Sequence, residues 1–154
     1  MEDRGLKLPF TLRHEPLGEG TGLGPQALGV SIGEKQIAYP WIGCVQCDVC
    51  KHDQELICMN PITIGTRQNG SYAEYLIVPY QKYLVPYEGV DKAVAATAAC
   101  SRITACSNLK KVRHLHSDES LLIVGASGVG LSRIELAKAV VKTKIIVAEL
   151  DPAK

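Results

Sequence analysis

The chain has 154 residues, and its hydrophobic share of 46% and charged share of 21% are typical of one soluble globular domain or slightly more. A formal net charge of +1 and an aromatic share of 5% argue against a nucleic-acid partner and against a membrane partner. The start, Met1 to Arg4, carries acids in place of an apolar signal core, and no apolar run approaches the roughly 20 residues of a membrane helix. The expected location is the cytoplasm.

The first 43 residues combine short extended segments with many glycines. Leu6 to Leu12, broken by Pro9, predicts an extended entry, and Ser31 to Tyr39, closed by Pro40, predicts a strand. His14 between them has two interpretations that the local sequence leaves open. It is either a polar loop or strand histidine, or a metal ligand.

The most informative stretch holds four cysteines separated by two, two and seven residues: Cys44, Cys47, Cys50 and Cys58. Zinc takes four thiolates in a tetrahedron at about 2.3 Å, and close pairs let one loop supply several corners. Gly43 before the run allows a tight turn, and the intervening polar residues predict an exposed lobe. A closed set of four thiolates leaves no open coordination position, so the predicted zinc site is structural.

The alternative for this lobe is a disulfide framework, which the chain's six cysteines would permit in an oxidising compartment. Nothing in the sequence indicates secretion. The spacing therefore favours zinc.

The segment after the cysteines predicts an antiparallel β region. Asn69-Gly70 is a strong signal for a tight turn. Tyr72 to Val78 is rich in strand-forming residues, and Gln81 to Val85 predicts a second short strand between prolines.

The apolar period changes to that of helices near Asp91. Ala93 to Ala99 has helical composition, and Ile103 to Val112 repeats apolar residues in threes with basic residues toward its end, where the helix dipole favours them. Cys100 and Cys106 read locally as small buried apolar residues. We place a domain boundary in the polar junction from Ser117 to Ser120.

The last segment predicts a strand–helix–strand unit: a buried strand at Leu121–Val124, a helix at Leu131–Val141 and a second buried strand at Ile145–Ala148. Between the first strand and the helix lies a glycine turn with Gly125, Gly128, Val129 and Gly130. In this context the turn predicts a dinucleotide site, because glycines let the backbone approach a pyrophosphate that the helix N-terminus attracts.

Glu149 closes the second strand, 19 residues after Gly130. An acid at about this distance bonds ribose hydroxyls and would repel a 2′-phosphate, so NAD is favoured over NADP. Glu149 is otherwise a solvated strand-end acid. Asp151 is the rival acid, although Asp151-Pro152 also suits the start of a helix.

Taken together, the chain resembles the zinc-dependent alcohol dehydrogenases of the medium-chain dehydrogenase/reductase family. The resemblance is carried by Tyr39 to Cys44, the four-cysteine lobe, Gly70 to Tyr75, Ala95 to Thr104 and the glycine turn. It implies part of a GroES-like β-barrel catalytic domain with its zinc lobe at residues 1–118, and the first βαβ of a Rossmann domain at 119–154. The order of elements predicts an internal fragment of a longer enzyme.

The resemblance also implies a second, catalytic zinc and an activity. It makes His14 and Cys100 ligands of that zinc, with Glu15 as the neighbouring acid. The zinc polarises an alcohol, which gives hydride to NAD⁺, so the expected partner is a small alcohol or aldehyde. The full-length form would be compatible with a homo-oligomer.

Some positions depart from the family pattern. No cysteine precedes His14, so the chain offers two protein ligands for the catalytic zinc, or three if Glu15 binds. Arg13 and Arg102 replace small residues beside the two ligands, and Ser127 replaces the middle glycine of the turn.

These departures keep two other hypotheses open. One is a catalytically inactive zinc-binding fragment or interaction module, which the missing cysteine ligand favours. The other is a thiol-based redox sensor, which would need exposed cysteines of low pKa.

Overall fold

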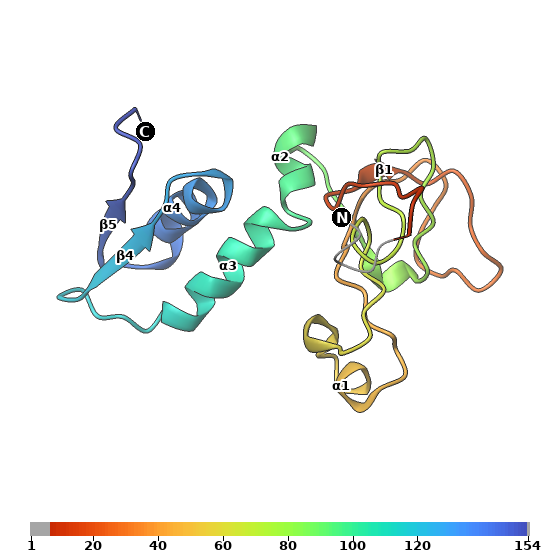
Figure 1. The fold of residues 1–154 in the computed structure, drawn as a ribbon, viewed down its shortest axis with the longest axis horizontal. Helices are drawn as coiled ribbons and strands as arrows, with labels where there is room; N and C mark the ends of the chain where they lie inside the picture. Colours follow the sequence, from red (N-terminus) through yellow and green to blue (C-terminus); the bar gives the residue numbers. More distant parts are fainter. Residues whose placement is uncertain (1–6, 154) are drawn as a thin grey trace. The chain divides into compact units, whose positions relative to one another are not determined.

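A computed structural model describes residues 7–153 and divides into two compact units between Ala99 and Cys100 (Figure 1). We describe each unit separately. The helix at residues 101–112, which the sequence analysis assigned to the first domain, lies in the second compact unit. The family-level domain boundary near residue 118 remains a prediction.

The first unit is built on a small antiparallel sheet with the strand order β1-β2-β3. Its strands are β1 (Leu17–Glu19), β2 (Lys35–Ala38) and β3 (Leu84–Pro86). Ile37 in the central strand is paired with Leu17 on one side and Val85 on the other. The strand expected at Ser31–Tyr39 is therefore present in shortened form. The strand expected at Gln81–Val85 is split into a 3-10 turn, η3 (Gln81–Tyr83), and β3.

The prediction of a strand at Tyr72–Val78 is wrong, because this segment has no regular secondary structure. Tyr72, Tyr75 and Ile77 are strongly exposed, with 68%, 75% and 86% of their surface accessible. Leu76 and Val78 still pack against the core of Ile42, Ile64 and Tyr83, so the segment contributes to a core without joining the sheet of the described residues.

Two helical turns lie in the cysteine lobe, and one helix follows the sheet. They are α1 (Asp48–Lys51), η2 (Glu55–Ile57) and α2 (Lys92–Thr97). Asp91 caps α2 by accepting hydrogen bonds from the N–H groups of Ala93 and Val94. The unit has two small cores. Ile37 packs with Ala95 and Ala99, and the other core contains Ile42, Ile64 and Tyr83.

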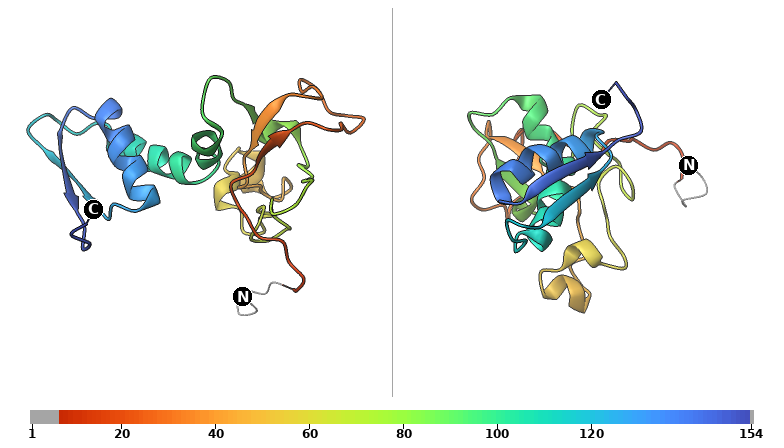
Figure 2. Two further views of the ribbon diagram at one scale, coloured as in Figure 1. Left: turned by 90° about the horizontal axis from the view of Figure 1, so that it is seen from above. Right: turned by 90° about the vertical axis from the view of Figure 1, so that its left-hand side faces the viewer.

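The second unit confirms the predicted strand–helix–strand order. Its elements are α3 (Ser101–Val112), β4 (Ser120–Val124), α4 (Gly128–Val140) and β5 (Lys144–Ala148). Strands β4 and β5 are parallel, and Leu122 is paired with Ile146. Figure 2 shows α4 alongside this pair of strands. A parallel pair needs such a crossover, and the core of the unit joins Leu109 from α3, Ile123 and Ala137.

The two strands were expected to be buried, but only one face of the pair is covered. Ile123 has 4% of its surface exposed, whereas Leu122 and Val124 have 57% and 72% exposed. Alternate residues of a strand point to opposite faces, so α3 and α4 cover one face only. Among residues 7–153, no helix combines the length and the apolar composition of a membrane-spanning segment.

Candidate functional site

Two adjacent chain segments connect the cysteine lobe to the rest of the first unit, and we call this connection the neck. The chain departs after Ile42 and returns at Ile62, whose N–H donates to the Ile42 carbonyl at 2.9 Å. Ile64 likewise donates to Pro40 at 3.1 Å. Ile42 and Ile64 are fully buried, so the neck stands on a packed core (Figure 1). In Figure 1 the loop that carries α1 projects from the rest of residues 7–99.

The four cysteines predicted as metal ligands meet in this lobe, with all four sulfur atoms within 4.8 Å of one another. The Sγ atom of Cys50 lies 3.5 Å from that of Cys47 and 4.0 Å from that of Cys44, and the Sγ atoms of Cys47 and Cys58 are 3.9 Å apart. Thiolates at the corners of a zinc tetrahedron of radius 2.3 Å would be about 3.8 Å apart. All six cysteines are free thiols, so the lobe has no disulfide. The donor set and its spacing therefore fit zinc.

Two thiols of the cluster have shifted pKa values. Hydrogen bonds from the backbone N–H groups of Gln46 and Cys47 lower the pKa of Cys44 to about 6. Burial, followed by the neighbouring thiols, raises the pKa of Cys50 to about 12. The cluster thus combines one thiol whose ionisation the backbone favours with one whose ionisation burial opposes, and zinc binding would release protons from such a set.

The backbone of the lobe is shaped around the sulfur atoms. A Cβ atom on Gly43 would lie 2.6 Å from the Cys50 sulfur and 2.9 Å from the Glu55 Cβ, so this glycine provides space for packing. Val45 has a φ of +54°, which is unusual for a β-branched residue. Strain of this kind persists where the surroundings fix the backbone, and here a turn between two ligands requires it.

Glu55 joins the lobe to the core of the first unit. Its carboxylate accepts hydrogen bonds from the Gly43 N–H at 3.1 Å, from the Tyr83 hydroxyl and from the Lys82 ammonium. Burial alone would raise the pKa of Glu55, but the bonds from Lys82, Tyr83 and Gly43 outweigh it and lower that pKa. Burial, followed by the Glu55 carboxylate, raises the pKa of Tyr83. Sequence patterns missed this residue because its partners are distant in the chain.

His14 lies in the first unit but outside the cysteine lobe. Its Nδ1 atom is 2.6 Å from the Ile64 carbonyl oxygen, and its ring meets the Trp41 ring edge-on at a centroid distance of 4.5 Å. A carbonyl only accepts, so Nδ1 carries a proton, and in the neutral imidazole Nε2 then presents its lone pair. Nε2 is buried without a hydrogen-bond partner in the part of the chain that the structure describes. An orphaned imidazole lone pair oriented by a carbonyl is the arrangement of a metal ligand.

Arg13, beside His14, adopts a φ of +93°, a conformation that favours glycine. Its guanidinium donates to the Tyr72 hydroxyl at 3.3 Å and lies 5.3 Å from the centre of the Tyr72 ring. Gly65 and Gly70 pack directly on the Arg13 carbonyl, where an added Cβ would overlap it. Gly70 is thus needed for close packing, and the tight turn that was predicted at Asn69-Gly70 is absent.

Two further residues were predicted for the catalytic zinc site, Glu15 in the first unit and Cys100 in the second. Glu15 is half-buried beside His14 in the first unit. Cys100 is half-buried at the start of α3 in the second unit, and its carbonyl accepts the Thr104 N–H at 2.9 Å. Cys106 is half-buried within α3. The pairing of His14 with Cys100 on one metal therefore stays a prediction.

The glycine turn that was predicted to bind a dinucleotide lies between β4 and α4. Gly125 has a φ of +87°, and a Cβ on Gly130 would overlap the Gly125 carbonyl. Helix α4 begins at Gly128, three residues earlier than predicted, so Val129 and Gly130 form its first turn. The Ser127 side chain makes no capping bond to that turn. Backbone N–H groups of the first turn are therefore directed toward a site that favours an anion.

Glu149 turns back onto the same loop. One carboxylate oxygen accepts the Ala126 N–H at 2.5 Å, and the other accepts the N–H groups of Leu150 at 2.8 Å and Asp151 at 3.2 Å. The strand-end acid therefore joins β5 to the turn after β4.

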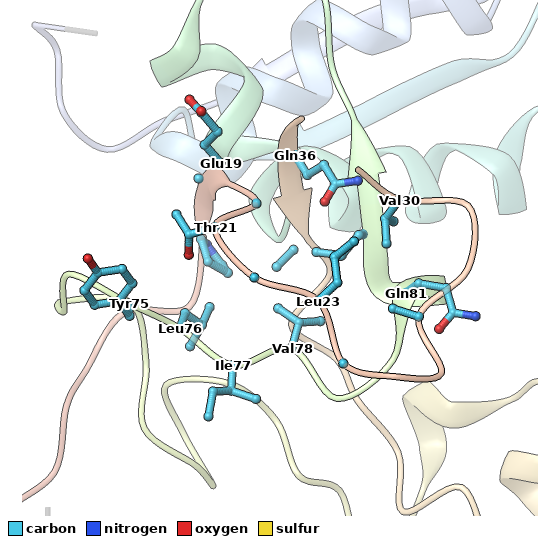
Figure 3. A pocket seen from close by; sticks show the side chains of 18 of the residues that line it. Glu19, Thr21, Leu23, Val30, Gln36, Tyr75, Leu76, Ile77, Val78 and Gln81 are labelled. Carbon is cyan, nitrogen blue, oxygen red and sulfur yellow. The ribbon is translucent and has the colours of Figure 1, made fainter. Parts of the chain in front are cut away.

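A cavity of about 970 Å³ lies between the glycine-rich stretch at 16–27 and the segment 71–81 (Figure 3). Figure 3 shows Leu23, Leu76 and Val78 around it. Its lining contains neither cysteine nor histidine. The metal-binding chemistry of the first unit thus lies outside this cavity.

Known protein sequences resemble most of this chain. Residues 1–89 match the family profile of the alcohol dehydrogenase GroES-like domain. An NAD-dependent alcohol dehydrogenase of Saccharolobus solfataricus is 37% identical over 147 residues, which cover 95% of this chain and 42% of that protein. An L-galactonate-5-dehydrogenase of Escherichia coli is 33% identical over 146 residues, which cover 95% of this chain and 42% of that protein.

Solved structures show the same fold. An alcohol dehydrogenase from Aeropyrum pernix has a TM-score of 0.87 and 24% identity, and the match covers 99% of this chain and 45% of that chain. A cobalt- and zinc-bound thermostable alcohol dehydrogenase from Pyrobaculum aerophilum has a TM-score of 0.81 and 27% identity, with 96% and 44% covered. The chain thus spans less than half the length of these relatives.

The chain belongs to the alcohol dehydrogenase GroES-like domain family, within the zinc-dependent medium-chain dehydrogenases/reductases. The family resemblance of the sequence is thereby confirmed. So is the fold class, a GroES-like β region with a cysteine lobe followed by a Rossmann-type βαβ.

Proposed function

We propose that this protein, in its full-length form, is a zinc-dependent alcohol dehydrogenase that transfers hydride from an alcohol to NAD⁺. The observation that carries the proposal is His14, whose buried Nε2 lone pair is oriented by the Ile64 carbonyl and unpartnered among the described residues. NAD-dependent alcohol dehydrogenases among its relatives support the choice of reaction and cofactor.

The residues of this chain would have separate roles. Cys44, Cys47, Cys50 and Cys58 would hold a structural zinc. His14 and Cys100 would hold the catalytic zinc, with Glu15 as neighbouring acid, and that zinc supplies Lewis-acid polarisation of the alcohol oxygen. The Nδ1–H group of His14 would stay hydrogen-bonded to the Ile64 carbonyl oxygen, and this bond fixes the orientation of the ring.

The second half of the proposal concerns the cofactor. Residues 119–154 would begin the NAD-binding domain, after a catalytic domain that ends near residue 118. The first turn of α4, which contains Gly128, Val129 and Gly130, would meet the pyrophosphate together with Gly125. Glu149 would bond the ribose hydroxyls while keeping its bond to the loop at Ala126.

The test of the function is NADH formation by the full-length protein with a panel of primary and secondary alcohols. Replacing His14 with alanine should lower turnover by roughly 1,000-fold, because Lewis-acid activation supplies several kcal/mol. His114→Ala is the matched control, since His114 is exposed and outside the site. Full activity in the His14 variant would contradict the catalytic zinc site. The 154-residue chain alone should show no turnover, because one βαβ holds only part of a dinucleotide.

Cofactor choice provides a second test. In the full-length protein, Glu149→Ala should weaken NAD binding and narrow the preference for NAD over NADP by roughly tenfold, since a hydrogen bond to a charged group is worth about 1.5–3 kcal/mol. Kinetic comparison of the two cofactors measures the change. Asp151→Ala, which removes the rival acid, should leave the preference unchanged. An unchanged preference for NAD over NADP in the Glu149 variant would show that this acid does not bind the ribose hydroxyls.

A further inference from the structure

Glu55 is tied to both ends of the cysteine set. Its side chain accepts from the N–H of Gly43, which immediately precedes Cys44, at 3.1 Å. Its backbone carbonyl accepts the Cys58 N–H at 3.0 Å. The Cys44 N–H in turn donates to the Cys58 sulfur at 3.4 Å. The first and last ligands of the cluster are therefore held together through Glu55 by bonds that need no metal.

The same carboxylate is fixed from outside the lobe. Tyr83, with 3% of its surface exposed, and Lys82 both donate to it from η3, 27 to 28 residues further along the chain. Tyr83 packs in one core with Ile42 and Ile64 at the neck of the lobe. Only 11% of the Glu55 side chain is exposed, so these bonds are well shielded from water.

We propose that Glu55 is a positioning residue of the metal centre, which sets the separation of Cys44 and Cys58 and couples metal binding to the core through Tyr83 and Lys82. The inference rests on the zinc site proposed above. Groups behind the ligands of a metal change its affinity by orienting those ligands, typically by 10–100-fold. Here the Glu55 carboxylate acts on the backbone beside Cys44, and the proposal requires no direct bond from Glu55 to a sulfur atom.

The test compares zinc loss from the purified 154-residue chain and from Glu55→Gln. Each protein is loaded with one equivalent of zinc and mixed with a chromophoric chelator. We expect zinc to transfer at least about tenfold faster from the variant. Glu34→Gln is the matched control, because Glu34 also accepts a backbone N–H, from Ser31 at 3.0 Å, but lies outside the lobe. It should release zinc at the wild-type rate.

Two further variants remove the outer partners and leave Glu55 in place. Tyr83→Phe and Lys82→Gln should each accelerate zinc loss, by less than Glu55→Gln does. Lys82 has 48% of its side chain exposed, so its variant should fold even if Glu55→Gln does not. Cobalt-loaded samples add a signature, because the thiolate-to-metal absorption bands report the geometry of the sulfur set. These bands should shift in Glu55→Gln and stay unchanged in Glu34→Gln.

A residue that only stabilised the fold would give a different pattern. Glu55→Gln would then melt at a lower temperature by the same amount with and without zinc, at an unchanged rate of zinc transfer and with unchanged cobalt bands. That result would overturn the inference while leaving the zinc site intact. A wild-type chain that holds no zinc would overturn both.

Discussion

Replacing Gly130 with alanine should destabilise the second unit by about 3 kcal/mol, the upper end of the cost of forcing a methyl group into a packed site. The added Cβ would overlap the Gly125 carbonyl, a backbone atom that cannot rotate away. Gly125 is also fixed, since its N–H donates to the Ala148 carbonyl at 2.7 Å. The turn would have to open, and the approach of a pyrophosphate would be lost with it.

Gly128→Ala is the matched control for this experiment. Nothing lies within 4 Å of the Cβ position at Gly128, and alanine is favoured over glycine in a helix by about 1 kcal/mol. This variant should be neutral or slightly more stable. Hydrogen exchange of the α4 amides, with urea unfolding of the whole chain, measures both. Equal effects of the two substitutions would contradict the close packing of Gly130 on Gly125.

Replacing Cys58 with serine should weaken zinc binding by roughly 100-fold. Structural zinc sites bind with about 10–16 kcal/mol at pH 7, and one thiolate of four supplies roughly 3 kcal/mol of that. Cys58 is buried, and its sulfur accepts N–H bonds from Cys44 and Asn60, each at 3.4 Å. Loss of the metal should loosen the lobe and make it sensitive to trypsin at Lys51, whose side chain is 63% exposed.

Cys106→Ser is the control for thiol loss, since Cys106 lies in α3 and belongs to no metal-binding group among the described residues. It should keep its zinc and its resistance to trypsin. Zinc content after dialysis and the rate of cleavage are the two measurements. A Cys58 variant with wild-type zinc content would show that the metal is held elsewhere.

The local patterns of the sequence predicted the parts of this protein that depend on neighbouring residues. The spacing of Cys44 to Cys58 placed four sulfur donors on one loop, and the structure brings them together. The βαβ order of residues 120–148 followed from apolar runs and a glycine turn, and its strands are parallel as predicted. Both signals are carried within about 30 residues, where periodicity and turn chemistry decide the outcome.

The predictions that were wrong or missing concern features that depend on packing between segments distant in the chain. Tyr72 to Val78 has strand-forming side chains, but no sheet of the described residues receives it. Gly70 was interpreted as a turn glycine, whereas its real constraint is the backbone of Arg13, 57 residues earlier. The role of Glu55 was not predicted, because its partners Lys82 and Tyr83 lie 27 and 28 residues further along the chain. A sequence pattern has no access to such long-range contacts.

X-ray absorption at the zinc edge, on the purified and dialysed 154-residue chain, tests the central claim most directly. The account predicts one tightly held zinc per chain, surrounded by four sulfur atoms at about 2.3 Å. Cys58→Ser, measured beside it, should retain less zinc. A zinc with nitrogen or oxygen atoms among its nearest neighbours, or a chain without zinc, would contradict the assignment of Cys44, Cys47, Cys50 and Cys58 as one closed metal centre.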